Sequence, residues 1–189
     1  VARDFVELPS QMMENWAFAE EVLPTYARHY ETGEPIPDEL VQKLQQVKQF
    51  NQGFATTEYL AASILDMKWH TLTTTERKDA LGFEAEVIDE IGLIPAVVTR
   101  YRTPYFAHIW DGGYDSGYYS YMWAEVLDAD AFAYFEEQGI FNAELAASFR
   151  KNILERGDTE PPMELYERFR GAEPSIEPLL KRRGLKMGN

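Results

Sequence analysis

The stretch GGYDSGYYSYMWAEVLDADAFAYFEEQG, from Gly112 to Gly139, carries the strongest indication of the fold. After the glycine pair, its pattern predicts one long, aromatic-rich helix from about Tyr114 to Gln138. Gly139 is placed to end this helix, because glycine is the commonest residue just beyond a helix C-terminus. The fold is therefore expected to be built around helices.

Apolar periodicity and helix-ending residues predict shorter helices on both sides of this stretch. The expected ranges are 12–30 with a kink or break at Pro24, 38–53, 56–70 with Thr56 or Thr57 as its cap, 83–91, 142–156, 161–170 and 175–183. Residues 93–105 are expected to be extended or irregular. Because no alternating strand pattern, internal repeat or low-complexity segment occurs, we predict a mostly α fold with residues 1–189 in one domain.

The composition is that of a soluble globular protein, with 45% hydrophobic and 14% aromatic residues in a chain of 189. Its net charge of −14 repels phosphate backbones and anionic lipids, which argues against nucleic acid and membrane partners. The absence of cysteine excludes disulfides and thiolate metal sites. No apolar run approaches the ~20 residues of a membrane span.

The start of the chain is unusual. It begins Val1-Ala2-Arg3 rather than with Met, and a helical pattern follows almost at once. This beginning predicts a fragment cut from a longer protein.

The segment from Tyr101 to Trp123 concentrates six of the eleven tyrosines. If the chain after Gly113 is helical, Tyr114, Tyr118 and Tyr121 fall at i, i+4 and i+7 and share one face. Phenolic hydroxyls in a water-poor cleft can stabilise a developing oxyanion. Tyrosines at helical spacing more often form a buried stripe, so the spacing alone leaves both interpretations open.

A histidine and a glycine pair precede these tyrosines. His108 can add a further hydrogen-bond donor to such a cleft, and Gly112-Gly113 can let the loop flex or let a peptide backbone approach closely. A single histidine before two glycines is more often structural. Both interpretations again stay open.

The second unusual stretch is RDFVELPSQMMENW, from Arg3 to Trp16, in which Glu7 lies between apolar neighbours just before a helix start. A helix that begins near Phe5 would place Glu7, Ser10, Gln11 and Glu14 in one polar stripe. Such a stripe is usually solvated, and the helix dipole favours acidic residues in a first turn. A zinc ligand is the sharper alternative, but it needs partners. No H-E-x-x-H occurs, and the three histidines have no metal-ligand spacing.

Both stretches, together with SFRKNILERG and ELYERFRGAEPSIEPLLKRRGL, resemble the C-terminal region of the thimet-oligopeptidase family of zinc metallopeptidases. Within it, the chain is most similar to the bacterial peptidyl-dipeptidases (dipeptidyl carboxypeptidases) and oligopeptidase A. The resemblance implies the C-terminal portion of a multi-helical catalytic domain with a deep substrate channel. It also implies one zinc ion, held by two histidines of H-E-x-x-H and a glutamate on a following helix.

The resemblance assigns Glu7 as that third zinc ligand. The two histidines and the general-base glutamate would lie upstream of Val1, so the isolated chain is expected to be inactive. Glu14, seven residues further on, is hypothesised to orient a ligand, on spacing alone.

The remaining site residues are carried over in the same way. The resemblance implies catalytic roles for Tyr121 and Tyr114 at the tetrahedral intermediate, and for His108 at the substrate backbone. Tyr118 is implied to face substrate, and Gly112-Gly113 to form a loop that closes over bound peptide. Asp111 and Asp115 depart from the small residues common there, which puts the loop's behaviour in doubt.

The function implied is zinc-dependent hydrolysis of short peptides, with release of C-terminal dipeptides. The alternatives are a zinc endo-oligopeptidase of the same family and a non-catalytic helical module that binds peptides. A monomer is expected. The family default is the cytoplasm, with the periplasm left open.

Overall fold

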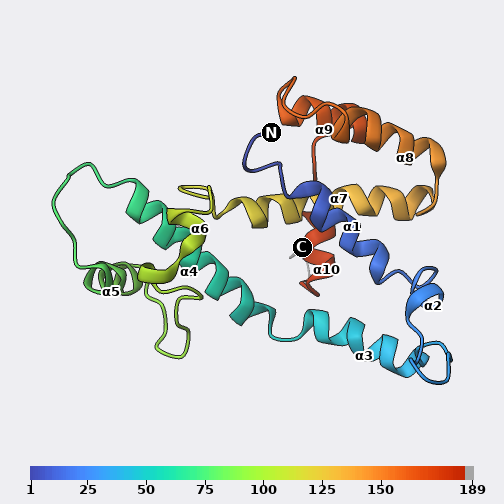
Figure 1. Cartoon of the computed structure of the whole chain (residues 1–189), viewed down its shortest axis with the longest axis horizontal. Helices are drawn as coiled ribbons and strands as arrows, with labels where there is room; N and C mark the ends of the chain where they lie inside the picture. Colours follow the sequence, from blue (N-terminus) through green and yellow to red (C-terminus); the bar gives the residue numbers. More distant parts are fainter. Residues whose placement is uncertain (186–189) are drawn as a thin grey trace. The chain divides into compact units, whose positions relative to one another are not determined.

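The computed structural model describes residues 1–185, and these confirm a mostly α fold (Figure 1). The only strand pairing within this part is an isolated bridge between Arg28 and Pro35. No helix in the described range is long and apolar enough to cross a membrane. The predicted domain extends over residues 186–189, which lie outside the described residues.

The helices follow one another along the chain, joined by turns and loops. They are α1 Leu8–Ala17, α2 Leu23–Tyr26, α3 Asp38–Gln49, α4 Gln52–His70, α5 Ala80–Glu90, the 3-10 turn η1 Thr103–Tyr105, α6 Ala107–Trp110, α7 Ser120–Gln138, α8 Ala143–Phe149, the π-helical turn η2 Arg150–Leu154, α9 Pro162–Arg170 and α10 Glu177–Arg182.

The chain divides into two compact units, one of residues 1–50 with residues 122 onward and the other of residues 51–121. In the first unit, every residue of α7 from Val126 to Ala131 is buried, so this helix is covered on all sides. The buried apolar side chains that form its main core come from α1 and the turn before it, and from α7, α8, η2 and α9. They are Phe5, Leu8, Met12, Leu127, Ala131, Phe135, Leu145, Phe149, Ile153, Leu165, Tyr166 and Phe169.

Two buried carboxylates of α7 fix other helices of the first unit. Asp128 accepts hydrogen bonds from Asn15 Nδ2 at 2.9 Å and Arg182 Nη2 at 2.7 Å, which joins it to α1 and α10. Asp130 accepts one from the Tyr166 hydroxyl of α9 at 2.7 Å. Because an unpaired charge is costly to bury, these partners decide where the neighbouring helices pack.

The second unit is built on α4 and α5. Leu65 of α4 packs with Phe83 and Val87 of α5, and the ring of Trp69 lies 4.3 Å from the ring of Phe83. After α5 the chain is irregular up to η1, as the prolines of residues 93–105 predicted.

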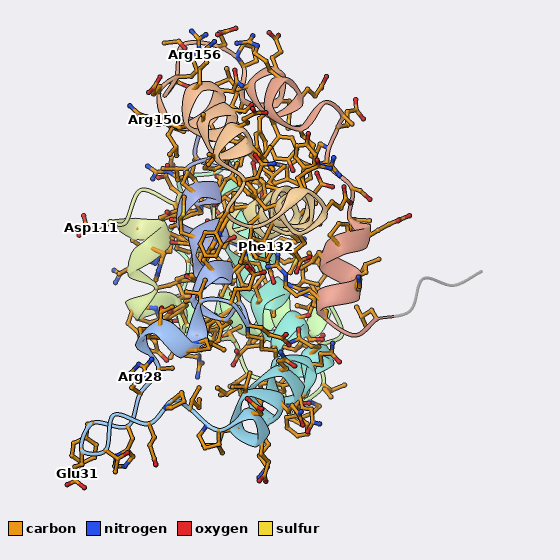
Figure 2. The ribbon with its side chains drawn as sticks, turned by 90° about the vertical axis from the view of Figure 1, so that its right-hand side faces the viewer. Arg28, Glu31, Asp111, Phe132, Arg150 and Arg156 are labelled. Carbon is orange, nitrogen blue, oxygen red and sulfur yellow. The ribbon has the colours of Figure 1, made fainter. Side chains whose placement is uncertain are left out.

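Several helix bounds differ from the predictions. The helix predicted over residues 12–30 is wrong, because α1 ends at Ala17, only the short α2 contains Pro24, and the chain then turns back. Figure 2 shows Arg28 and Glu31 on that turn, where Tyr30 is 87% exposed. Helix α4 starts after Asn51, which has a left-handed φ of 57°, and not at a threonine cap.

The predictions made from capping residues near the C-terminal end are confirmed. Asn142 caps α8, and its side chain accepts hydrogen bonds from the backbone N–H groups of Glu144 and Leu145. Helix α9 ends at Gly171, whose φ of 84° is left-handed.

Candidate functional site

The predicted tyrosines and histidine meet in the second unit as a cluster of rings. We call His108, Tyr114, Tyr118 and Tyr121 the ring cluster. The ring of His108 lies 6.2 Å from that of Tyr114, 5.5 Å from that of Tyr118 and 6.3 Å from that of Tyr121. Tyr114 and Tyr121 stack with centroids 4.9 Å apart and planes 27° apart. Three phenol rings and one imidazole ring are therefore neighbours in the folded second unit.

The local structure that brings these rings together is not the predicted helix face. Helix α7 begins at Ser120, so Tyr114 and Tyr118 lie in consecutive turns before it. Ser116 has a left-handed φ of 56°, which a continuous helix excludes, and the N–H of Gly117 bonds to the Tyr114 carbonyl at 2.8 Å. The i, i+4, i+7 argument was wrong, although the rings it named do meet.

Gly112 and Gly113 determine the backbone conformation of this loop. A Cβ on Gly112 would lie 2.8 Å from the Cα of His108 and 3.0 Å from its carbonyl oxygen, so only glycine fits there. Gly113 has a left-handed φ of 73°. The turn they make lets the N–H of Tyr114 bond to the His108 carbonyl at 2.9 Å. The pair therefore sets the position of Tyr114 relative to His108.

The members of the ring cluster differ in exposure. Tyr118 is only 3% exposed, and burial raises the pKa of its hydroxyl well above the usual range. Its carbonyl accepts a hydrogen bond from the Tyr59 hydroxyl, and the two rings stack 5.2 Å apart. His108, Tyr114 and Tyr121 are half-buried. These three are the members whose polar atoms can meet a ligand.

Asp66 of α4, which the sequence analysis missed, holds the loop that carries two of the tyrosines. Its side chain is fully buried and accepts hydrogen bonds from the N–H groups of Ser116 at 3.0 Å and Tyr118 at 2.9 Å. It also pairs with His70 Nδ1 at 2.8 Å. The sequence did hold an indication that Asp66 is buried and paired. Asp66 lies one turn after buried Ala62 and one turn before His70, on the same helix face.

A second buried carboxylate, Glu84 of α5, holds the irregular segment before the cluster. It accepts hydrogen bonds from the Thr103 N–H at 2.8 Å and from Arg102 Nε. This segment contains Tyr101, whose ring lies 5.2 Å from the ring of His108. Glu84 is 1% exposed, so these hydrogen bonds offset the cost of burying its carboxylate.

Glu7 belongs to the first unit and directly precedes α1. Its Oε2 accepts a hydrogen bond from Ser10 Oγ at 3.0 Å, and its side chain is half-buried beside fully buried Leu8. Within the described residues, no three or more His, Asp or Glu side chains could together hold a metal ion. One accessible, oriented carboxylate fits a single position in a metal site whose other ligands come from elsewhere.

Three further acidic residues are solvent-facing. Glu14 is exposed, and so are Asp111 and Asp115 in the loop around the glycine pair. Figure 2 shows Asp111 pointing away from the ribbon.

The chain belongs to peptidase family M3, whose family model matches residues 1–185. It is 44% identical over 187 residues to dipeptidyl carboxypeptidase of Escherichia coli and 46% identical over 187 residues to oligopeptidase A of the same organism. Saccharolysin of Saccharomyces cerevisiae is 33% identical over 184 residues.

These alignments cover nearly all of the chain but little of each relative. They include 98%, 97% and 97% of the chain, and 28%, 27% and 26% of the relatives. The chain therefore spans little more than a quarter of the length of the curated relatives it matches.

Proposed function

We propose that the protein containing this chain is a zinc-dependent peptidase that hydrolyses short peptides and releases dipeptides from their C-termini. In this proposal, the chain supplies one zinc ligand and the hydrogen-bond donors that face substrate. The observation that carries it is the ring cluster, which has two stacked, half-buried phenols beside an imidazole in a member of peptidase family M3.

Glu7 is proposed as the zinc ligand of this chain. Its carboxylate is half-buried at the start of α1, and the hydrogen bond that it accepts from the Ser10 hydroxyl can help to orient it toward a metal. Two histidines of an H-E-x-x-H motif upstream of Val1 would complete the ligand set. When bound there, zinc would supply Lewis acidity toward the scissile carbonyl and would lower the pKa of a water molecule.

The ring cluster would act on the peptide itself. Hydroxyl groups of Tyr121 and Tyr114 donate hydrogen bonds to the oxyanion that develops on the scissile carbonyl. His108 contacts the peptide backbone, and Tyr118 is proposed as a further substrate contact. Because Tyr118 is buried in the described chain, that contact would need its neighbours to move. The glycine pair would form part of a loop over the bound peptide.

The test is the product pattern from the full-length parent protein. An octapeptide with a free C-terminal carboxylate and the same peptide with a C-terminal amide are incubated with and without a zinc chelator. Products are then identified by mass spectrometry. We expect chelator-sensitive, successive loss of C-terminal dipeptides from the free peptide and little cleavage of the amide, because capture of a free carboxylate fixes the cut two residues from the end.

Other outcomes separate the alternatives. Internal, chelator-sensitive cuts in both peptides would identify an endo-oligopeptidase instead. Binding without cleavage by folded, zinc-loaded protein would identify a helical peptide-binding module and refute the proposed hydrolysis.

A further inference from the structure

We infer that Asp66 is a positioning residue for the catalytic tyrosines, holding the loop between His108 and α7 in the conformation that brings Tyr114 and Tyr121 together. The inference rests on the proposed function. Asp66 itself lies beneath the loop and is fully buried, so it acts through the loop backbone and not on substrate.

The contacts of Asp66 use both carboxylate oxygens. Oδ1 accepts the Ser116 N–H at 3.0 Å and lies 2.8 Å from His70 Nδ1, while Oδ2 accepts the Tyr118 N–H at 2.9 Å. These two N–H groups lie 50 and 52 residues further along the chain. The carboxylate therefore fixes a distant loop to the C-terminal end of α4.

The same part of α4 also supports the short helix that carries His108. The ring of His70 lies 5.4 Å from that of Trp110, and the ring of Trp69 lies 5.5 Å from it. Trp110 ends α6, two residues after His108. The last turn of α4 thus contacts the chain before the glycine pair through the rings of Trp69 and His70. It contacts the chain after the pair through the carboxylate of Asp66.

The loop needs an acceptor of this kind because its conformation is unfavourable alone. Ser116 has φ 56°, a left-handed value that non-glycine residues adopt at a cost. Each of the two backbone N–H groups uses a different acceptor atom of Asp66, Oδ1 for Ser116 and Oδ2 for Tyr118. Asparagine has the same shape but places an NH₂ donor where one of those acceptors stands, so Asp66→Asn should release one side of the loop.

The experiment compares Asp66→Asn with Asp130→Asn in the full-length parent protein. Asp130 is a matched control because it is a buried aspartate that bonds Tyr166 and Arg170 of α9, outside the second unit. We expect Asp66→Asn to lower kcat by about 10²-fold with little change in KM, because misplaced groups weaken contacts made in the transition state. Asp130→Asn should alter the stability but leave kcat within about threefold.

Two further measurements distinguish positioning from a general structural defect. Hydrogen exchange followed by mass spectrometry should show faster exchange at Ser116 and Tyr118 in Asp66→Asn and no change there in Asp130→Asn. In a protein that already carries Tyr114→Phe and Tyr121→Phe, adding Asp66→Asn should cost less than about threefold in kcat, because the groups it positions are gone.

The inference is overturned if Asp66→Asn and Asp130→Asn lower kcat equally, if the exchange at Ser116 and Tyr118 is unchanged, or if the full loss of kcat persists in the double-phenylalanine protein. A parent protein that cleaves no peptide would refute the proposed function instead. The exchange measurement would then still decide whether Asp66 holds the loop.

Discussion

Replacing Gly112 with alanine tests whether the loop depends on the close approach of Gly112 to the backbone of His108. The added Cβ would lie 2.8 Å from the Cα of His108, about 0.6 Å inside the 3.4 Å at which ordinary contact begins, and 3.0 and 3.2 Å from the carbonyl oxygens of His108 and Ala107. All three neighbours are backbone atoms, so no side chain can rotate away. Overpacking of this kind costs ~1–3 kcal/mol, and we expect Gly112→Ala to destabilise the second unit by that amount.

Gly53→Ala is the matched control in the same unit. Gly53 lies in the first turn of α4, and a Cβ there would meet nothing within 4 Å. Alanine should therefore stabilise the helix, by up to ~1 kcal/mol. Both glycines belong to residues 51–121, so one unfolding transition reports on both.

The assay is equilibrium urea unfolding of the 189-residue chain, followed by circular dichroism. We expect the midpoint to fall for Gly112→Ala and to rise or stay constant for Gly53→Ala. In the parent protein, Gly112→Ala should also lower kcat, because the backbone shift moves Tyr114 relative to His108. A Gly112→Ala chain as stable as the original would show that the loop has another conformation and would refute this reasoning.

Three further outcomes are expected. Tyr121→Phe in the parent protein should lower kcat by ~10²–10³ if its hydroxyl binds the oxyanion, whereas Tyr119→Phe, outside the ring cluster, should not; steady-state kinetics compares them. Glu7→Gln should weaken zinc binding in a competition titration with a chelator by more than the ~10–100-fold that is typical when only a residue orienting a metal ligand is replaced, because Glu7 is proposed as a ligand itself. Burial and the bond to Asp130 raise the pKa of Tyr166 above its ordinary 10.0, so above pH 10 only the unfolded phenol ionises and stability falls. Tyr166→Phe should flatten this alkaline fall in urea unfolding and cost ~1 kcal/mol at pH 7; an unchanged slope would contradict the assignment.

Sequence patterns predicted those helix ends that depend only on residues close in the sequence. The cap at Asn142 and the left-handed end of α9 at Gly171 were predictable because a cap is satisfied within a few residues of itself. The long α7 was predicted with the correct end but started six residues too early. Its aromatic residues suit a helix, and nothing local announces that Ser116 adopts a left-handed conformation.

The sequence named residues whose rings lie together, but it did not predict the local structure that brings them together, and the roles of these residues stay predictions. The resemblance named His108 and the tyrosines, and the rings do meet, but a helix face was the wrong reason. The missing information is long-range. Asp66 accepts hydrogen bonds from the N–H groups of Ser116 and Tyr118, which lie 50 and 52 residues further along the chain. Periodicity within α4 cannot reveal a partner at that distance.

The cost of the Ser116 conformation can be compared with the free energy that the hydrogen bonds to Asp66 contribute. The comparison explains why turns can hold these tyrosines in place. The left-handed conformation of Ser116 costs ~1–3 kcal/mol. Hydrogen bonds to a charged group contribute ~1.5–3 kcal/mol each, and Asp66 accepts two from the loop backbone. The balance favours the observed turn only while both bonds exist, because one bond alone roughly cancels the strain. The turn that carries Tyr114 and leads into α7 at Tyr121 therefore depends on the carboxylate of Asp66, a residue of α4 that lies far from both tyrosines in the sequence.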